Sequence, residues 1–195
     1  AKMSYTIMPG DRAPNFENLI ATNGNKYSLK DINLKPITVI FFTCNHCPYV
    51  TGSDELTREI ANKYKEQVNF AAINSNSQNT YDEDSYEGMV ARMEQYKFPW
   101  LYLHDATQKI AKEYGALKTP HFFLFDSEWN LIYTGRSNDN PRNTSERTTN
   151  ELEEAIKKTL SGEKISVSVT NPIGCNVKWD GKPAHWMPAE ACDLI

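Results

Sequence analysis

Two cysteines stand three positions apart in the stretch FFTCNHCPYV, at Cys44 and Cys47. The thiolate is the reactive form of cysteine, and a free thiol with a pKa of about 8.5 is mostly protonated at neutral pH. Chemistry at this pair therefore requires surroundings that stabilise the anion. His46 lies between the two cysteines and can hydrogen-bond to a thiolate or neutralise it. The spacing predicts a pair that alternates between dithiol and disulfide.

The pair falls at a predicted junction between a strand and a helix. The apolar run at 37–42 is typical of a strand covered on both faces, and Pro48 suits the first turn of a helix. A helix N-terminus carries free N–H groups and about half a positive charge. We expect this field to lower the pKa of Cys44, which makes Cys44 the attacking nucleophile and Cys47 the resolving thiol. The mechanism requires a pair that solvent can reach and a reduction potential above that of thioredoxin, about −270 mV.

Two other uses of the pair are less favoured. A structural zinc site needs a second compact pair of ligands, which Cys175, His185 and Cys192 do not form. A plain buried thiol pair gives no reason for both sulfurs to lie where a strand meets a helix. We therefore expect no metal and no cofactor other than a redox-active disulfide between Cys44 and Cys47.

The composition predicts a soluble globular protein of 195 residues, 39% of them hydrophobic and 24% charged. A formal net charge of −4 offers no attraction to nucleic acid, and no apolar run approaches the ~20 residues of a membrane span. The N-terminal segment lacks the apolar core of a signal peptide, which favours the cytoplasm unless such a peptide has been removed from a periplasmic protein. The expected partners are protein or small-molecule thiols and disulfides, together with a reductase or an oxidase.

Apolar runs alternate with helical patterns along the chain. The runs that begin at Val68, Pro99 and His121 have the β-branched and aromatic character of the first strand, and amphipathic stripes lie between them. This alternation predicts an α/β fold, and HFFLFD followed by LIYTG predicts an antiparallel hairpin that makes the central sheet mixed. A shorter N-terminal hairpin is expected around Asn23 and Gly24.

We expect a single domain over residues 1–195, with its core at about 8–162. The tail at 163–195 shows no clear periodicity and is expected to pack on the domain. Three pairs of residues resemble capping boxes at helix starts. They are Asp84 with Glu87, Asp105 with Gln108, and Thr148 with Glu151.

Five motifs give the chain a family resemblance: CNHCP after FF, AINSN after the next strand, KTPHFFLFD, YTGR and IGCNVKW. Together they resemble the thioredoxin-fold redoxins of the AhpC/TSA superfamily, and more narrowly the peroxiredoxin-like subgroup that carries CxxC. The resemblance covers roughly residues 8 to 179. It implies a thioredoxin-like fold and a thiol–disulfide oxidoreductase with an antioxidant role in cell redox homeostasis.

The resemblance also assigns further site residues. Thioredoxins carry a cis-proline that faces the active-site pair, and Pro120 falls in its place. Thr119 and Pro120 become substrate-binding candidates, because the backbone beside this proline pairs with the substrate chain. His121 is a further candidate for the pocket because it follows Pro120, although a histidine that flanks a strand is the simpler interpretation. Arg136 and Cys175 are accessory candidates, as a cation and as a third thiol. From the residues alone, a solvated arginine and a packed tail cysteine are the simpler interpretations.

Two alternative functions stay open. Peroxiredoxins use P-x-x-x-T-x-x-C and an arginine, and here Cys47 takes the peroxidatic position while Cys44, Ile40 and Pro120 replace the threonine, the proline and the arginine. Peroxide activation needs groups that polarise the O–O bond, and the usual set is missing, so a thiol-dependent peroxidase is the alternative. A non-catalytic redox-sensing or binding module, with the tail tryptophans as contacts, is the third hypothesis.

The proton acceptor for the thiol chemistry is unassigned. Thioredoxins hold a buried aspartate on the strand before the pair, whereas the strand at 37–43 contains no carboxylate. His46 and water are the remaining candidates.

Overall fold

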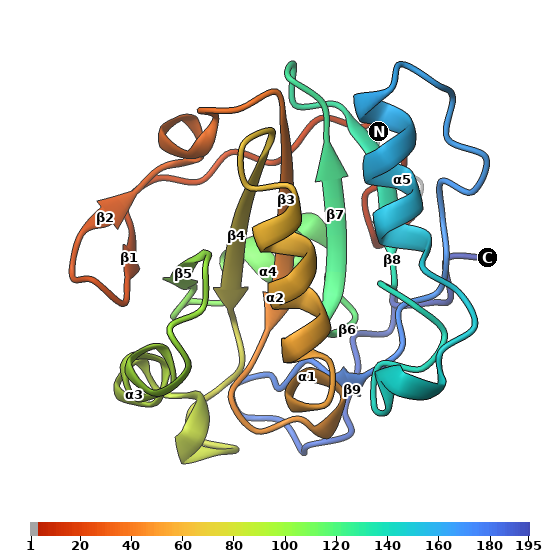
Figure 1. Cartoon of the computed structure of the whole chain (residues 1–195). Coiled ribbons are helices and arrows are strands. Elements are labelled where there is room, and N and C mark those ends of the chain that lie inside the picture. Colours follow the sequence, from red (N-terminus) through yellow and green to blue (C-terminus); the bar gives the residue numbers. More distant parts are fainter. Residues whose placement is uncertain (1–3) are drawn as a thin grey trace.

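The computed structural model describes residues 4–195 and is built around one central mixed sheet (Figure 1). Within these residues the sheet has seven strands in the order β2-β1-β5-β4-β3-β7-β8. The strands are β1 (Leu19–Ala21), β2 (Lys26–Tyr27), β3 (Ile37–Thr43), β4 (Val68–Asn74), β5 (Leu101–His104), β7 (His121–Phe125) and β8 (Leu131–Gly135). A separate two-stranded sheet joins β6 (Lys118–Thr119) to β9 (Cys175–Asn176).

The strand pairings confirm the predicted mixed sheet. β3, β4 and β5 run parallel, while β7 pairs antiparallel with both β3 and β8. The predicted N-terminal hairpin is also present, since β1 pairs antiparallel with β2 across a turn at Gly24, whose φ of 85° suits glycine. Because parallel strands end at the same edge of a sheet, β3 and β4 deliver their C-terminal loops side by side.

β3 lies at the centre of the sheet because its side chains are apolar on both faces. Ile37, Val39 and Phe41 enter one hydrophobic cluster, and Ile40 and Phe42 enter the other. Successive side chains of a strand point to opposite faces, so an unbroken apolar run must be covered twice. All seven residues of β3 are buried, as that pattern requires.

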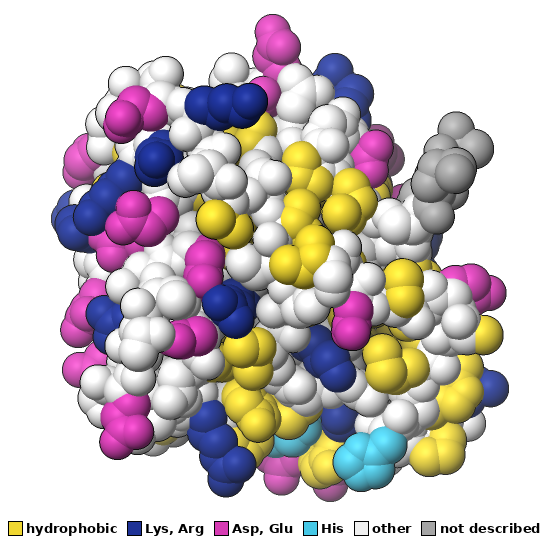
Figure 2. Space-filling model, turned by 90° about the vertical axis from the view of Figure 1, so that its right-hand side faces the viewer, with side chains coloured by type: hydrophobic (Ala, Val, Ile, Leu, Met, Phe, Trp, Pro, Cys, Tyr) yellow, Lys and Arg dark blue, Asp and Glu magenta, His cyan; other side chains and the backbone are white. Residues whose placement is uncertain are grey.

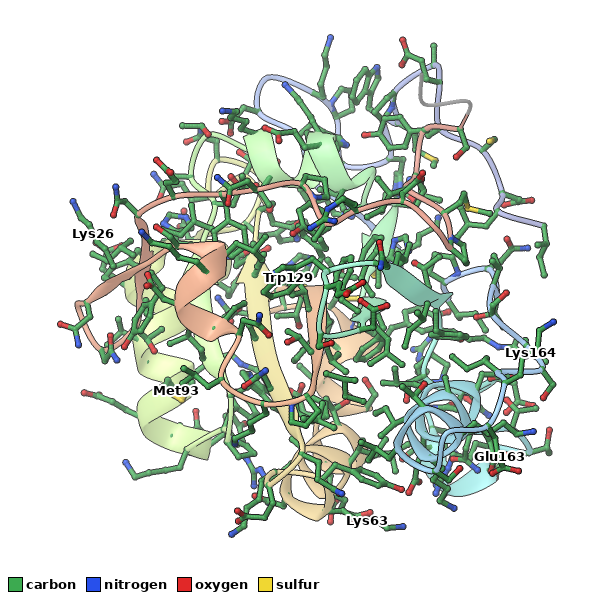
Figure 3. The ribbon with its side chains drawn as sticks, turned by 90° about the horizontal axis from the view of Figure 1, so that it is seen from above. Lys26, Lys63, Met93, Trp129, Glu163 and Lys164 are labelled. Carbon is green, nitrogen blue, oxygen red and sulfur yellow. The ribbon has the colours of Figure 1, made fainter. Side chains whose placement is uncertain are left out.

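The helices cover both faces of the sheet, as Figure 3 shows from above. They are α1 (Pro48–Thr51), α2 (Asp54–Lys63), α3 (Tyr86–Tyr96), α4 (Lys109–Tyr114) and α5 (Glu151–Leu160), with short 3-10 turns η1 (Leu29–Ile32), η2 (Asp82–Asp84) and η3 (Thr144–Glu146). Leu56, Met89 and Ile156 bring α2, α3 and α5 to one face. Tyr114 of α4 and Trp179 of the tail pack on the other.

The three predicted capping boxes are displaced in the structure. The N-cap of α3 is Ser85, whose Oγ accepts the Gly88 N–H at 3.0 Å, and Asp84 ends the preceding turn η2. Gln108 caps α4 and Asn150 caps α5. Because Ser85 caps α3, the Asp84 carboxylate does not cap that helix. It makes its contacts beside the cysteine pair instead.

The tail follows α5 and returns across the domain to β6, near α1 in Figure 1. On the face shown in Figure 2, acidic and basic side chains are interspersed and hydrophobic ones form small groups. No helix in residues 4–195 is long and apolar enough to cross a membrane.

Candidate redox site

The cysteine pair occupies the loop between β3 and α1. Pro48 is the first residue of α1, and Cys47 is its N-cap, with extended backbone and a carbonyl that accepts the N–H groups of Val50 and Thr51 at 3.0 and 2.9 Å. The proline suits this position because its fixed φ matches a helix and its missing N–H has no partner there. The helix starts at Pro48, as predicted, and its N-cap is Cys47, so Cys44 lies three residues before the cap.

Cys44 is the protonated member of the pair. Its side chain is 1% exposed, and its Sγ lies 3.5 Å from Thr119 Oγ1. Burial raises the pKa of Cys44 well above its ordinary value, and its hydrogen bond to Cys47 raises it further. The expectation of a lowered Cys44 pKa is therefore wrong, because removal from water outweighs any helix field at this position.

Cys47 carries the stabilised thiolate. The hydrogen bond from Cys44 is the largest contribution, and together with a further one from Cys175 it outweighs burial and lowers the pKa of Cys47 to about 5. Cys47 Sγ also lies 3.5 Å from the Thr119 carbonyl oxygen. Thiolate character is thus favoured on Cys47, whereas the prediction placed it on Cys44.

The pair is closed to solvent, contrary to the accessibility that the predicted mechanism requires. Cys44 is 1% exposed and Cys47 is 0% exposed. They form a small cluster with Val50, against which Tyr49 and Cys175 pack. Direct attack by an external molecule on either sulfur is excluded in this conformation.

His46 is held beside the pair by a buried carboxylate. Its Nδ1 lies 2.6 Å from Asp84 Oδ2, and its ring stacks on Tyr81 with centroids 3.8 Å apart. Asp84 is fully buried and also accepts the Asn45 N–H at 2.7 Å and the Asn76 side-chain amide at 3.1 Å. One ligand atom each of Cys44, His46 and Asp84 lies within 4.8 Å of the others.

Asp84 is the functional residue that the sequence analysis missed. The missing carboxylate was sought on β3, but it comes from the polar loop after β4. The signal was present, since β3 and β4 are neighbouring parallel strands whose ends share an edge. The resemblance of Asp84 and Glu87 to a capping box concealed it.

The same three residues do not fit a metal ion in this arrangement. Tetrahedral ligands at about 2.0–2.1 Å from zinc lie about 3.3 Å apart, whereas His46 Nδ1 and Asp84 Oδ2 are 2.6 Å apart. That distance is a hydrogen bond, which suits a proton and not a cation between the two atoms. In the cluster of Cys44, His46 and Asp84, the histidine and the carboxylate are therefore joined by a hydrogen bond.

The Thr119–Pro120 peptide bond is cis, as predicted. Thr119 contacts both sulfurs, one through its hydroxyl and one through its carbonyl. His121 instead belongs to the core, because its Nδ1 accepts the Leu117 N–H at 3.2 Å and its Nε2 faces Thr134 Oγ1 at 3.1 Å. Complete burial lowers the pKa of His121 to about 3, so this imidazole is neutral. The predicted pocket role of His121 finds no support in these contacts.

The two accessory candidates have opposite outcomes. The Arg136 guanidinium donates two hydrogen bonds to Glu151 of α5, at 3.1 and 2.7 Å, and no contact between Arg136 and either cysteine is found in residues 4–195. Cys175 lies at the site, with its Sγ 2.7 Å from Cys47 Sγ. Arg136 is thus ion-paired rather than simply solvated, and Cys175 is a packed tail cysteine that also reaches the pair. Cys192 is exposed.

This architecture defines a class of protein. A mixed α/β sheet that presents a cysteine pair before a helix, opposite a cis-proline, is a thioredoxin-like redox fold. The chain belongs to the Redoxin family, whose model matches residues 8–156. This match confirms the family resemblance and shows redox enzyme activity in general terms.

Solved structures support the same assignment. A hypothetical protein from Sinorhizobium meliloti 1021 is 33% identical, with 92% of this chain and 98% of that chain covered and a TM-score of 0.84. An uncharacterized conserved protein from Geobacillus kaustophilus is 34% identical, with 92% and 96% covered and a TM-score of 0.82. A putative thiol:disulfide interchange protein DsbE from Chlorobium tepidum shares the fold at 17% identity, with 80% and 98% covered and a TM-score of 0.61. None of the curated proteins matches the chain in sequence.

Proposed function

We propose that this protein is a thiol–disulfide oxidoreductase whose redox pair is Cys44 and Cys47. The observation that carries the proposal is the opposite polarisation of the two sulfurs. The pKa of Cys47 is lowered to about 5, while that of Cys44 is raised. One sulfur is thus a ready nucleophile and leaving group at neutral pH, and the other supplies the proton that stabilises it.

The chemistry follows from this polarisation. In a conformation that exposes the pair, the Cys47 thiolate attacks one sulfur of a disulfide, so that a mixed disulfide forms and the other sulfur leaves as a thiolate. Cys44 then loses its proton and attacks Cys47 Sγ, which releases the second substrate sulfur and leaves a Cys44–Cys47 disulfide. Two electrons have passed from the pair to the substrate, and the reverse sequence delivers a disulfide.

The second step needs a proton acceptor at Cys44. His46 and Asp84 supply one, because their polar atoms lie within 4.8 Å of the Cys44 sulfur and are already joined by a 2.6 Å hydrogen bond. A positioned acid–base group contributes about 10²–10⁴ in rate. The His46 side chain is 13% exposed and therefore connects the buried carboxylate to solvent.

Turnover of insulin disulfides by a reducing system tests the proposal. Wild type and Cys192→Ser should turn over equally, whereas Cys47→Ser and Cys44→Ser should both lose activity because neither can form the internal disulfide. Full activity in Cys47→Ser would place the reactive sulfur elsewhere.

A thiol peroxidase is the second candidate, and the thiolate of Cys47 at a helix start favours it. Attack of this thiolate on a peroxide would give a sulfenic acid on Cys47 and release an alcohol or water, after which Cys44 would form the disulfide and release water. Arg136 is paired with Glu151 and does not assist that step. Peroxide consumption, measured with the same variants, separates the two enzymes. Absence of turnover with either substrate would favour a redox-sensing module.

A further inference from the structure

The tail lies where an external substrate chain is expected to bind. β9 pairs antiparallel with β6, with Thr119 opposite Cys175 and Lys118 opposite Asn176. Thr119 precedes the cis-proline, and the family resemblance implies that the backbone here pairs with substrate. The register brings the Cys175 sulfur to 2.7 Å from Cys47 Sγ. The protein's own cysteine thus occupies the position of a substrate sulfur.

The contacts of the tail fix Cys175 in this place. The Lys178 N–H donates to Asn76 Oδ1 at 2.9 Å, and Val177 is 2% exposed in the core. Gly174 packs so closely on β6 that a Cβ would lie 2.1 Å from the Thr119 carbonyl oxygen. The segment before and after Cys175 is therefore fitted to the domain.

Accessibility distinguishes the three sulfurs. Cys44 and Cys47 are buried, whereas Cys175 is partly exposed. Of these three residues, only Cys175 is partly exposed, and its sulfur also touches the pair. Electrons that enter or leave the closed site therefore have a short route through it.

We propose that Cys175 is a third catalytic thiol, which exchanges electrons between the buried pair and external thiols or disulfides through a Cys47–Cys175 disulfide. The inference rests on the proposed function, because Cys175 can transfer electrons to or from Cys44 and Cys47 only if these two form a redox pair. It also explains how a sealed pair reacts with molecules outside.

The steps balance from the oxidised protein. The Cys175 thiolate attacks Cys47 Sγ, so that the Cys47–Cys175 bond forms, the Cys44–Cys47 bond breaks and Cys44 leaves and takes up a proton. An external thiolate then attacks the exposed Cys175 sulfur, and Cys47 leaves as a thiolate. A second external thiolate releases the bound one as a disulfide and restores the Cys175 thiol. Two external thiols are oxidised while the pair is reduced, and disulfide reduction runs the steps backwards.

The charges around Cys175 suit this exchange. In the reduced state the neighbouring Cys47 thiolate and burial keep Cys175 protonated, and they raise its pKa to about 12. Formation of the Cys44–Cys47 disulfide removes that negative charge. Burial still raises the pKa of Cys175, but the ammonium groups of Lys178 and Lys118 act against this rise, so the pKa is lower when attack on Cys47 is required.

Disulfide mapping tests the exchange directly. Cys44→Ser is treated with glutathione disulfide, digested and analysed by mass spectrometry. We expect a Cys47–Cys175 bond, which forms as Cys47 displaces glutathione from Cys175. The bond should persist when Cys192→Ser is added, and Cys47 should stay reduced when Cys175→Ser is added. Glutathione that stays on Cys175, or that reaches Cys47 equally fast in Cys175→Ser, would overturn the proposal.

Turnover separates failure of this proposal from failure of the proposed function. Cys175→Ser should lower insulin-disulfide turnover at least tenfold relative to Cys192→Ser, and glutathione disulfide should convert Cys44 and Cys47 into a disulfide rapidly in Cys192→Ser but slowly in Cys175→Ser. Thermal unfolding verifies that both variants are folded. Equal turnover of the two variants would overturn the role of Cys175 and leave the redox pair intact. Failure of the pair to form a disulfide in every variant would overturn the proposed function itself.

Discussion

Three features meet at the Cys47 sulfur: the start of α1, the Cys44 thiol and the Cys175 thiol. The sequence shows the first two, since Pro48 marks the first turn of the helix. It does not show that burial would outweigh the helix field at Cys44. The desolvation that raises the pKa of Cys44 depends on neighbours from β6 and the tail, which no local pattern contains.

The protonation of Cys47 is open to a direct test. Its thiolate, followed by ultraviolet absorbance, should form as pH rises through about 5. Cys44→Ala removes the hydrogen bond that contributes most to the lowering, so the midpoint should move upward by about one unit or more, equivalent to about 1.4 kcal/mol per unit. An unchanged midpoint in Cys44→Ala would show that another group stabilises the anion.

Asp84 makes a second prediction. Asp84→Asn keeps the shape of the side chain but removes the charge that holds His46, so turnover should fall at least tenfold, within the range of acid–base catalysis. The fall should be accompanied by a changed pH profile of turnover, which a purely structural defect would not produce. The control is Asp82→Asn, an exposed neighbour in η2. Equal pH profiles in the two variants would remove Asp84 from the mechanism.

The elements that hold the site were largely predictable. β3, β4 and β7 are buried on both faces, so their sequences are largely apolar. Such apolar runs predict strands. The hairpin at Gly24 and the end of α4 at Gly115 follow from glycine at positive φ. These features are local, and local signals were sufficient for them.

The contacts that complete the site were not predictable from local signals. The path of the tail depends on single hydrogen bonds, such as that from Lys178 to Asn76, across a sequence separation of 102 residues. Asp84 and Cys175 reach the pair from different elements, and neither shows a periodicity that marks its destination. The family resemblance supplied the cis-proline, because that feature belongs to the fold and not to one segment.

The fit of β9 against β6 gives a third prediction. Gly174→Ala places a methyl group against the Thr119 carbonyl and should force β9 away, so that the yield of Cys47–Cys175 disulfide falls several-fold in a Cys44→Ser background. Gly181→Ala is the control from the same tail. Its Cβ would meet nothing within 4 Å, and its φ of 73° predicts only a local loss of stability of about 1 kcal/mol. Equal disulfide yields in the two variants would mean that β9 does not position Cys175.

Taken together, the sheet, the helices and the tail enclose a thiol pair that is polarised but closed. The sheet sets Cys44 and Cys47 at its edge, the loop after β4 brings the buried carboxylate, and the tail brings the only partly exposed sulfur of the three that meet there. The Redoxin match covers residues 8–156, so Cys175 lies outside the matched segment. Family membership therefore accounts for the presence of the cysteine pair. In our proposal, the tail accounts for electron exchange between the pair and external molecules.

A redox titration tests the central claim most directly. The protein is equilibrated in glutathione buffers of defined potential, and the state of each cysteine is read by differential alkylation and mass spectrometry. The stabilised Cys47 thiolate predicts that Cys44 and Cys47 change state together, as one two-electron couple, at a potential above about −270 mV. If both stay reduced throughout, or change state independently, Cys44 and Cys47 are not the redox pair of this protein.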